Sequence, residues 1–198
     1  MYLLINKQIP WVGDNVQGHS WNGQEIDSTE GFGAYDDVCE RYALSGRIVD
    51  VGGGAYDTNS AYVAQKYLID CSVYDPYKRD AEHNRKVIER TRVQPFNGVV
   101  SFSVLNVISD DKARHEHIKL CQTMLKTGGL AIFKVWPGDM TEIGKETSSG
   151  YQSNRDIHTY VDEIRDVFGL QNVTFDPEHK IVVSRNALEI YPSGSRCI

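Results

Sequence analysis

The stretch GRIVDVGGGAY, residues 46–56, decides the fold. Its first half contains the apolar run RIVDV, which predicts a short buried strand over residues 47–51. Three consecutive glycines follow, and because glycine has no Cβ, it permits positive φ and a close approach to the main chain. A helical pattern over 60–68, with Asn59 or Ser60 as N-cap, leads to a second apolar strand over 71–75. The stretch therefore starts a strand, helix, strand unit.

The alternation of strands and helices continues along the rest of the chain. Helices are expected over residues 33–44, 79–92, 110–125 and 156–168, and strands over 98–108, 130–136, 172–175 and 181–184. A Gly-Gly pair at 128–129 is expected to end the third of these helices. The last two strands are joined by a short turn and form a hairpin. The pattern predicts an α/β fold with a Rossmann-like, doubly wound, mostly parallel sheet and a C-terminal antiparallel hairpin.

Composition predicts a single soluble domain. The chain has 198 residues, 27 acidic against 21 basic side chains, and a net charge of −6, which disfavours binding to a long nucleic-acid duplex. A cluster of Lys and Arg over 77–92 is interpreted as a solvated helix face. There are four cysteines without a CxxC pair, and neither a signal segment nor a membrane-length apolar run is evident, so a cytoplasmic protein is expected. We expect one domain over 1–198, with an irregular arm over 1–30 and the core over 31–198.

The glycines and the acid that ends the second strand predict an adenosine site. In doubly wound sheets the first strand-to-helix turn touches a nucleotide-like ligand, and Asp75, 23 residues after Gly52, is placed to accept hydrogen bonds from two ribose hydroxyls. Asp57 stands where a dinucleotide fingerprint has its third glycine. An acid there, and Asp50 before the turn, suit a cationic ligand better than a pyrophosphate. S-adenosylmethionine fits this requirement.

Several motifs resemble those of class I S-adenosylmethionine-dependent methyltransferases. VDVGGGAY is similar to their motif I, VYDPY to the end of their second strand, VVSFSVLNVISDD to their fourth strand, and LKTGGLAIFKVW to the junction before their fifth. The resemblance implies methyl transfer from the sulfonium, with the cofactor held by Asp50, Gly52, Gly53, Gly54 and Asp75, and with Leu105 and Asn106 at the mouth of the methyl donor site. These enzymes have a third strand between the second and fourth, for which this chain offers little room. His83 or Asn84 is expected to replace its adenine contact.

A narrower resemblance suggests catalytic residues. GGLAIFKVWPGD, YVDEIRDVF and PEHKIVVS resemble the end of RNA ribose 2′-O-methyltransferases, which use a Lys-Asp-Lys-Glu tetrad. Lys134 and Glu178 match two of its members. The fourth strand has Asn106 in place of the aspartate, and the helix over 33–44 has Arg41 in place of a lysine. The run SVLNVI is instead similar to a group of small methyltransferases, some associated with DNA modification in bacteria or phages.

The sequence therefore predicts a small methyltransferase in which Asn106, Lys134 and Glu178 are the catalytic candidates. Asn106 is singled out because a buried amide in an apolar run must be hydrogen-bonded. The long polar loop over 137–155 is expected to contact the substrate through Tyr151, Gln152, Asn154 and Arg155, and Trp11 and Trp21 to stack on a base. His115 and His117 are two apart on a helix and point away from each other, so no metal is expected.

The identity of the acceptor stays open between a small molecule and the base or ribose of a single nucleotide. Two other classes of function remain as alternatives. One is a non-catalytic module that binds S-adenosylmethionine beside a degraded acceptor site. The other is a nucleotide-dependent oxidoreductase, which the imperfect GxGxxG disfavours.

Overall fold

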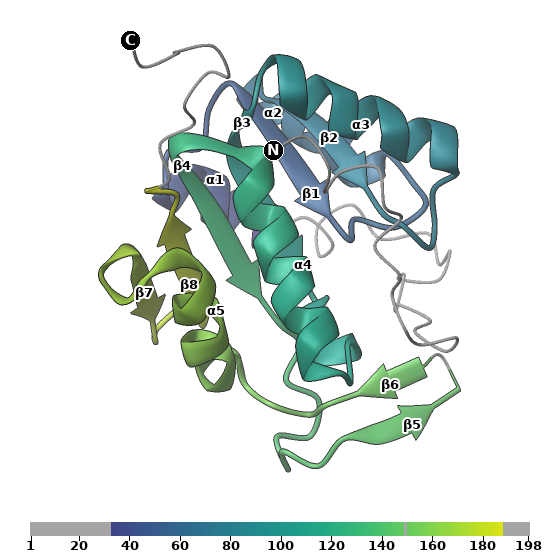
Figure 1. Cartoon of the computed structure of the whole chain (residues 1–198), viewed down its shortest axis with the longest axis vertical. Helices are drawn as coiled ribbons and strands as arrows, with labels where there is room; N and C mark the ends of the chain where they lie inside the picture. The colour runs from purple at the N-terminus through teal and green to yellow at the C-terminus, as the bar shows by residue number, and fades with distance from the viewer. Residues whose placement is uncertain (1–32, 149, 188–198) are drawn as a thin grey trace, which may run out of the picture.

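The computed structural model describes residues 33–148 and 150–187. The whole of the expected N-terminal arm over 1–30, including Trp11 and Trp21, lies outside the described residues, as does Cys197. The described chain forms one six-stranded sheet with helices on both faces, and a small separate hairpin (Figure 1). The expected α/β, Rossmann-like architecture with a mostly parallel sheet is confirmed.

The central sheet has the strand order β2-β1-β3-β4-β8-β7. The first four strands pair in parallel, and β8 pairs antiparallel with both β4 and β7. The C-terminal hairpin is thereby added at the β4 side of the sheet, as predicted. The strands are β1 (Arg47–Val51), β2 (Asp70–Tyr74), β3 (Phe96–Phe102), β4 (Leu125–Lys134), β7 (Val173–Asp176) and β8 (Ile181–Arg185).

Helices cover the sheet in two groups, each with its own apolar core. On one face α1 (Gly33–Arg41) and α2 (Thr58–Tyr67) pack through Val38 and Val63 onto Ile48 and Ile132. On the other face lie α3 (Ala81–Val93), α4 (Asp111–Met124) and α5 (Val161–Phe168). In Figure 1, α4 and α5 lie on the viewer's side of the sheet, one on each side of β4. Both faces of the parallel strands are therefore buried, which explains why their central residues are mostly apolar rather than alternating between apolar and polar.

The third strand expected in this class of fold is missing. Residues 75–95 are all described, and they contain α3 but no strand. Only two residues separate the end of α3 at Val93 from the start of β3 at Phe96. β2 is therefore the outermost strand of the described sheet on that side.

The expected long strand over 98–108 was wrong in its second half. β3 ends at Phe102, Ser103 adopts a φ of 57°, and the 3-10 helix η1 (Leu105–Val107) follows. All three residues of η1 are buried, and periodicity alone cannot tell a buried turn from a buried strand in a continuous apolar run. The change of direction at Ser103 places Asn106 beyond the edge of the sheet.

The expected stop at the two glycines was also wrong, because β4 begins at Leu125 and runs through them. The main chain of Asn186 holds them in place: the Gly128 N–H donates to the Asn186 carbonyl at 2.7 Å, and the Asn186 N–H donates to the Gly129 carbonyl at 2.9 Å. The N-cap of α2 is Asp57 rather than Asn59 or Ser60.

The polar loop over 137–155 is partly ordered into a second, two-stranded sheet. β5 (Lys145–Thr147) and β6 (Gly150–Gln152) pair antiparallel and project beyond the main sheet (Figure 1). The helical region after it begins with η2 (Ile157–Tyr160), and η3 (Leu170–Asn172) precedes β7. Among the described residues, no helix is long and apolar enough to cross a membrane.

Candidate functional site

The glycine turn and Asp75 lie side by side at the carboxyl edge of the sheet. β1 and β2 are parallel and in register, with Val51 opposite Tyr74, so the residues that follow the two strands meet. The Gly52 N–H donates to the Tyr74 carbonyl at 2.7 Å, and the Gly54 N–H donates to a carboxylate oxygen of Asp75 at 2.9 Å. The expected pairing of the glycine turn with the acid of the second strand is therefore present.

The Asp75 carboxylate holds this edge together through main-chain hydrogen bonds. Its second oxygen accepts from the N–H groups of Tyr77 and Lys78, both at 2.9 Å. An ionised carboxylate offers about four acceptor positions. With three N–H donors already bound, one position remains for a ligand hydroxyl, rather than the two that the sequence suggested.

The protein itself fills the space beside two of the three glycines. A Cβ on Gly53 would lie 2.5 Å from a carboxylate oxygen of Asp50, and a Cβ on Gly52, where φ is 91°, would lie 2.4 Å from Val104. Gly54 also has a positive φ, of 79°. The glycines are thus required by close packing of Asp50 and Val104 and by backbone conformation, whether or not a ligand is bound.

Asp50 is a buried carboxyl group directly beneath the turn, 3 % exposed. Burial raises its pKa to about 6, with the nearby negative charge of Asp75 adding to the shift and a hydrogen bond donated by the Tyr35 hydroxyl opposing it. Burial likewise raises the pKa of Tyr35 well above its usual range. A carboxylate with so poorly solvated a charge would be stabilised by a cationic partner at the turn.

The turn after β2 is fixed to the glycine turn by α3 and by Arg79. The Arg79 guanidinium donates to the Gly54 carbonyl at 2.8 Å and to Asp57 at 2.8 Å. Asn84, one of two expected adenine contacts, bonds instead to the main-chain N–H and C=O of Asp75, at 3.1 and 2.8 Å. The other, His83, contacts the Val73 carbonyl through Nε2 at 2.8 Å. An adenine contact for either stays a prediction.

Asn106 and Gln152 form a buried pair of amides. Asn106 lies in η1, and its Nδ2 donates to Oε1 of Gln152 at 3.0 Å. The two side chains are 2 % and 1 % exposed. Oδ1 of Asn106 is buried and has no hydrogen-bond partner in the described part of the chain. The structure therefore joins a predicted catalytic residue to a predicted substrate contact, whereas the neighbouring Leu105 is fully buried in the core under α4.

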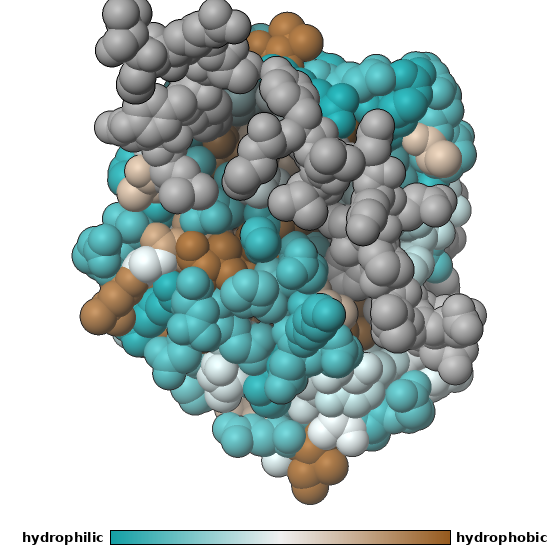
Figure 2. All heavy atoms as spheres, in the orientation of Figure 1, coloured by the Kyte–Doolittle hydropathy of each residue, from teal (hydrophilic) through white to brown (hydrophobic). Residues whose placement is uncertain are grey.

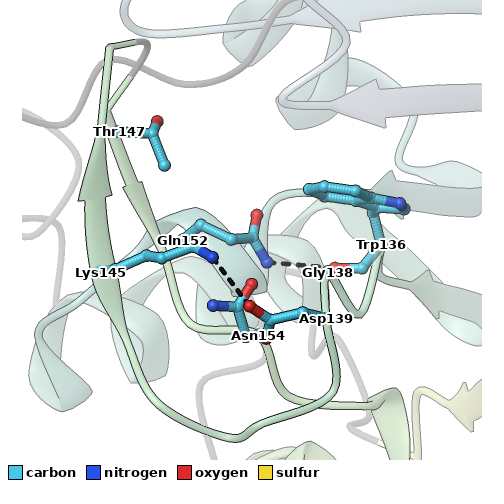
Figure 3. Close-up of a pocket in the computed structure, with 7 residues that line it drawn as sticks. All are labelled: Trp136, Gly138, Asp139, Lys145, Thr147, Gln152 and Asn154. Carbon is cyan, nitrogen blue, oxygen red and sulfur yellow. Dashed lines mark hydrogen bonds and ion pairs between the residues drawn. The ribbon is translucent and has the colours of Figure 1, made fainter.

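A pocket of about 370 Å³ opens between the end of β4 and the β5–β6 hairpin. Its wall includes the indole of Trp136, and the Gln152 amide donates to the Trp136 carbonyl at 3.3 Å (Figure 3). Lys145 forms a 2.8 Å ion pair with Asp139 across the loop. The lining residues are Trp136, Gly138, Asp139, Lys145, Thr147, Gln152 and Asn154.

Two of the four expected substrate contacts line this pocket and two do not. Gln152 and Asn154 are in its wall. Tyr151 instead places its hydroxyl where a Cβ on Gly144 would sit, and the Arg155 guanidinium stacks 4.2 Å over the Tyr160 ring. Trp136 was not predicted as a site residue because the apolar run placed it in the strand. The signal in the sequence was a large aromatic directly before the Pro-Gly pair at 137–138.

Lys134 lies at the end of β4 and faces α1 rather than the amide pair. Its Nζ is 3.6 Å from a carboxylate oxygen of Asp37, and Asp37 is also 3.3 Å from the Arg41 guanidinium. Arg41 in turn contacts Nε2 of His179 at 2.6 Å. A chain of polar contacts thus runs from Lys134 to the β7–β8 turn. The sequence pattern points to Lys134 and Arg41 but not to Asp37 or His179, the other residues of this chain of contacts.

Glu178 sits in that turn with its side chain 85 % exposed. Its carboxylate is 3.9 Å from His179 Nε2. His179, rather than Glu178, is the residue of the turn that contacts Arg41 of α1. Nδ1 of His179 is 3.0 Å from Asp176, which orients the ring. A catalytic role for Glu178 stays a prediction.

His117 and the described cysteines have structural surroundings. Nε2 of His117 is 2.8 Å from the Ser101 hydroxyl in the α4 face of the sheet, and burial lowers the pKa of His117 to about 4. Its neighbour His115 is exposed. Within residues 33–148 and 150–187, no group of three or more His, Cys, Asp or Glu side chains could hold a metal ion, and Cys39, Cys71 and Cys121 are free thiols.

No protein-family model matches the sequence, and neither does any curated protein sequence. Solved structures do resemble the fold. An O-methyltransferase family protein from Burkholderia thailandensis matches with a TM-score of 0.52 at 16 % identity, over 78 % of this chain and 55 % of its own. The present chain thus spans about half the length of that protein.

Two further structures match with lower scores. DesVI from Streptomyces venezuelae has a TM-score of 0.48 at 13 % identity, over 77 % of this chain and 88 % of its own. CalS10, an amino pentose methyltransferase from Micromonospora echinaspora solved with bound SAM, has a TM-score of 0.49 at 12 % identity, over 86 % and 93 %. At 16 % identity the match to the Burkholderia protein shows a shared fold alone, and the chemistry has to be argued from the site.

Proposed function

We propose that this protein is an S-adenosylmethionine-dependent methyltransferase. The observation that carries the proposal is the arrangement at the ends of β1 and β2, where Asp50 lies under the glycine turn and Asp75 accepts the Gly54 N–H. The likeness of the fold to the O-methyltransferase family protein supports it. The proposed acceptor is a small molecule, or the base or ribose of one nucleotide.

The residues present fit the cofactor by the sign of their charge and by their free acceptor positions. Two carboxylates, Asp50 and Asp75, stand at the turn, and the one nearby guanidinium, Arg79, is already bound to Gly54 and Asp57. This set suits a ligand with ammonium and sulfonium charges and disfavours a pyrophosphate. The free position on Asp75 would accept from one ribose hydroxyl.

When bound, S-adenosylmethionine supplies a methyl group that is already activated by its positive sulfur. The work left to the chain is to position the acceptor and to receive its proton. Asn106 is the candidate for positioning, because its buried Oδ1 lacks a partner and η1 follows directly on Val104, which touches Gly52. Lys134, in its neutral amine form, is the candidate for proton removal, with Asp37 orienting its amino group at 3.6 Å.

The test is calorimetric titration of S-adenosylhomocysteine into the full chain and into Asp75→Asn. Asn cannot accept from three N–H groups, because one of its two terminal atoms is a donor. Asp70→Asn is the matched control, since it makes the same change at the other end of β2, where Asp70 forms an ion pair with Arg90 at 2.6 Å. We expect micromolar binding that Asp75→Asn weakens at least tenfold and Asp70→Asn leaves unchanged.

Absence of S-adenosylhomocysteine binding, or tighter binding of a nicotinamide dinucleotide, would contradict the proposal. A labelled methyl donor offered with a panel of nucleosides, amino sugars and phenols then separates an enzyme from a non-catalytic module. Transfer to any acceptor that Lys134→Met reduces supports the catalytic assignment. Cofactor binding without transfer to any acceptor supports the non-catalytic alternative.

A further inference from the structure

We infer that the pocket between Trp136 and the β5–β6 hairpin is the acceptor site, and that it takes an uncharged, planar nitrogen heterocycle of the nucleobase type. The inference rests on the proposed function and goes beyond it by naming the pocket and the class of ring. It also separates the two acceptor groups considered above, because it assigns recognition to the base rather than to the ribose.

The position of the pocket relative to the glycine turn is the first argument. Val104 contacts Gly52, and Asn106, two residues later, bonds to Gln152 in the pocket wall at 3.0 Å. The Ser153 N–H also donates to the Asn106 carbonyl at 2.9 Å. The β5–β6 hairpin is therefore fastened to the same short segment that packs on the proposed cofactor turn. A ligand in the pocket would lie next to η1, which connects the two sites.

The aromatic wall is the second argument. Trp136 is 59 % exposed, although it follows a fully buried strand core. Figure 3 shows its indole along one side of the pocket and Thr147 on the opposite side. A large aromatic ring held open to solvent beside a cavity has an apolar face free for stacking. Planar heterocycles stack on such a ring regardless of their identity, because every base has a π face.

The polar wall is the third argument. Gln152 and Asn154 are buried amides of the wall, and each already uses one N–H, toward the carbonyls of Trp136 and Ile143. A primary amide has a second N–H and two oxygen lone pairs, so each side chain keeps donor and acceptor positions that match the mixed edge of a heterocycle. The charged residues of the wall, Asp139 and Lys145, are paired with each other at 2.8 Å. Lys145 and Thr141 also lower the pKa of Asp139 to about 2, so this pair persists at neutral pH. The pocket therefore offers no uncompensated charge to an ionic ligand.

The size of the pocket agrees with a single ring system. A volume of about 370 Å³ lies at the lower end of the range found for small-ligand sites. A free nucleoside and the base of a single-stranded nucleic acid present the same chemistry to this wall. The net charge of −6 does not favour the polymer, so we take the free nucleoside as the source to be tested first.

The experiment titrates nucleosides and a four-nucleotide single strand of the same base into the full chain saturated with S-adenosylhomocysteine. The variants are Trp136→Ala and Trp136→Phe, with Leu170→Ala as the control for loss of an exposed apolar side chain elsewhere. We expect at least one nucleoside to bind, with affinity reduced about 10- to 100-fold by Trp136→Ala and by no more than about threefold by Trp136→Phe. All three variants should bind S-adenosylhomocysteine as the unmodified chain does.

The outcomes separate the two proposals. If S-adenosylhomocysteine binds and no nucleoside or oligonucleotide does, the acceptor inference is overturned while the proposed function stands. If S-adenosylhomocysteine fails to bind, the proposed function fails first. Nucleoside binding that Trp136→Ala leaves unchanged also overturns the assignment of the pocket. Equal affinity for the nucleoside and the four-nucleotide strand supports the free compound, and tighter binding of the strand by tenfold or more identifies nucleic acid as the source.

Discussion

Replacement of the buried amide pair, Asn106 and Gln152, should give an asymmetric effect on stability. Leu copies the branching of Asn, and Met copies the linear shape of Gln, so the variants are Asn106→Leu, Gln152→Met and the double change. Leaving a buried polar atom without a partner costs about 1–3 kcal/mol. Asn106→Leu removes one such atom, the unpaired Oδ1, and creates another, the Gln152 oxygen. These two changes in the free energy of unfolding have opposite signs, so Asn106→Leu should change it by no more than about 1 kcal/mol.

Gln152→Met has no such compensation. It leaves Nδ2 of Asn106 without its acceptor while Oδ1 stays unpaired, so both ends of a 2 %-exposed amide are unsatisfied. We expect it to lower the free energy of unfolding by about 1–3 kcal/mol, which for a chain of this length is a fall of roughly 2–12 °C in Tm. The double variant removes all of these polar atoms and should be more stable than Gln152→Met alone.

The assay is urea unfolding followed by circular dichroism, with thermal melts as a second measurement. Equal destabilisation by Asn106→Leu and Gln152→Met would refute the reasoning, because it would mean that Oδ1 of Asn106 has a partner. A double variant less stable than Gln152→Met would refute it as well. Under the proposed function, Asn106→Leu should nevertheless abolish methyl transfer, and a stable but inactive variant would separate the catalytic role from the structural one.

Three further predictions concern the glycine turn and two buried titrating groups. Gly53→Ala should weaken S-adenosylhomocysteine binding and lower Tm, because the new Cβ would lie 2.5 Å from Asp50. Gly33→Ala, with open space around its Cβ, should do neither, and equal effects of the two variants in calorimetry and thermal melts would contradict this. The folded-state pKa of Asp50 is raised from 3.8 to about 6, so Asp50 adds stability as pH falls from 6 to 4, on the order of 2–3 kcal/mol. Asp50→Asn should remove this gain, which is measured by comparing unfolding curves at pH 4.5 and pH 7. The folded-state pKa of His117 is lowered from 6.5 to about 4, so the stability that neutral His117 contributes is lost as pH falls from 6.5 to 4. His117→Gln should therefore lose less free energy of unfolding than the unmodified chain between pH 7 and pH 4.5.

The order of elements could be predicted from the sequence because it depends on local patterns. Apolar runs ended by Gly or Asp marked β1 and β2, and helical periodicity marked α3 and α4. The missing third strand also followed from local information, since the segment between Asp75 and β3 holds little beyond one helix. These features are decided by chain length and residue order, which a single sequence displays.

The site was only partly predictable because its geometry depends on contacts between distant residues. Asn106 was recognised as unusual from its apolar neighbours, but its partner Gln152 is 46 residues away. Asp37 and His179 were missed because nothing local marks them: they become neighbours of Lys134 and Arg41 only when α1 packs beside the end of β4 and the β7–β8 turn. The packing of Val104 beside Gly52 could not be foreseen for the same reason.

Among the described strands β2 has a neighbour on one side only, and an unpaired strand edge in other proteins can pair with a strand from another molecule. Strand carbonyls alternate in direction. The Tyr74 carbonyl accepts from Gly52, which directly follows β1, so the Val73 carbonyl points to the opposite side, away from β1. That outward carbonyl is the one that His83 contacts at 2.8 Å, and Arg90 likewise contacts the Ser72 hydroxyl at 2.9 Å. Side chains of α3 thus obstruct the margin where a neighbouring strand would dock. Within the described residues, we therefore expect these α3 side chains to hinder the addition of a further strand along β2.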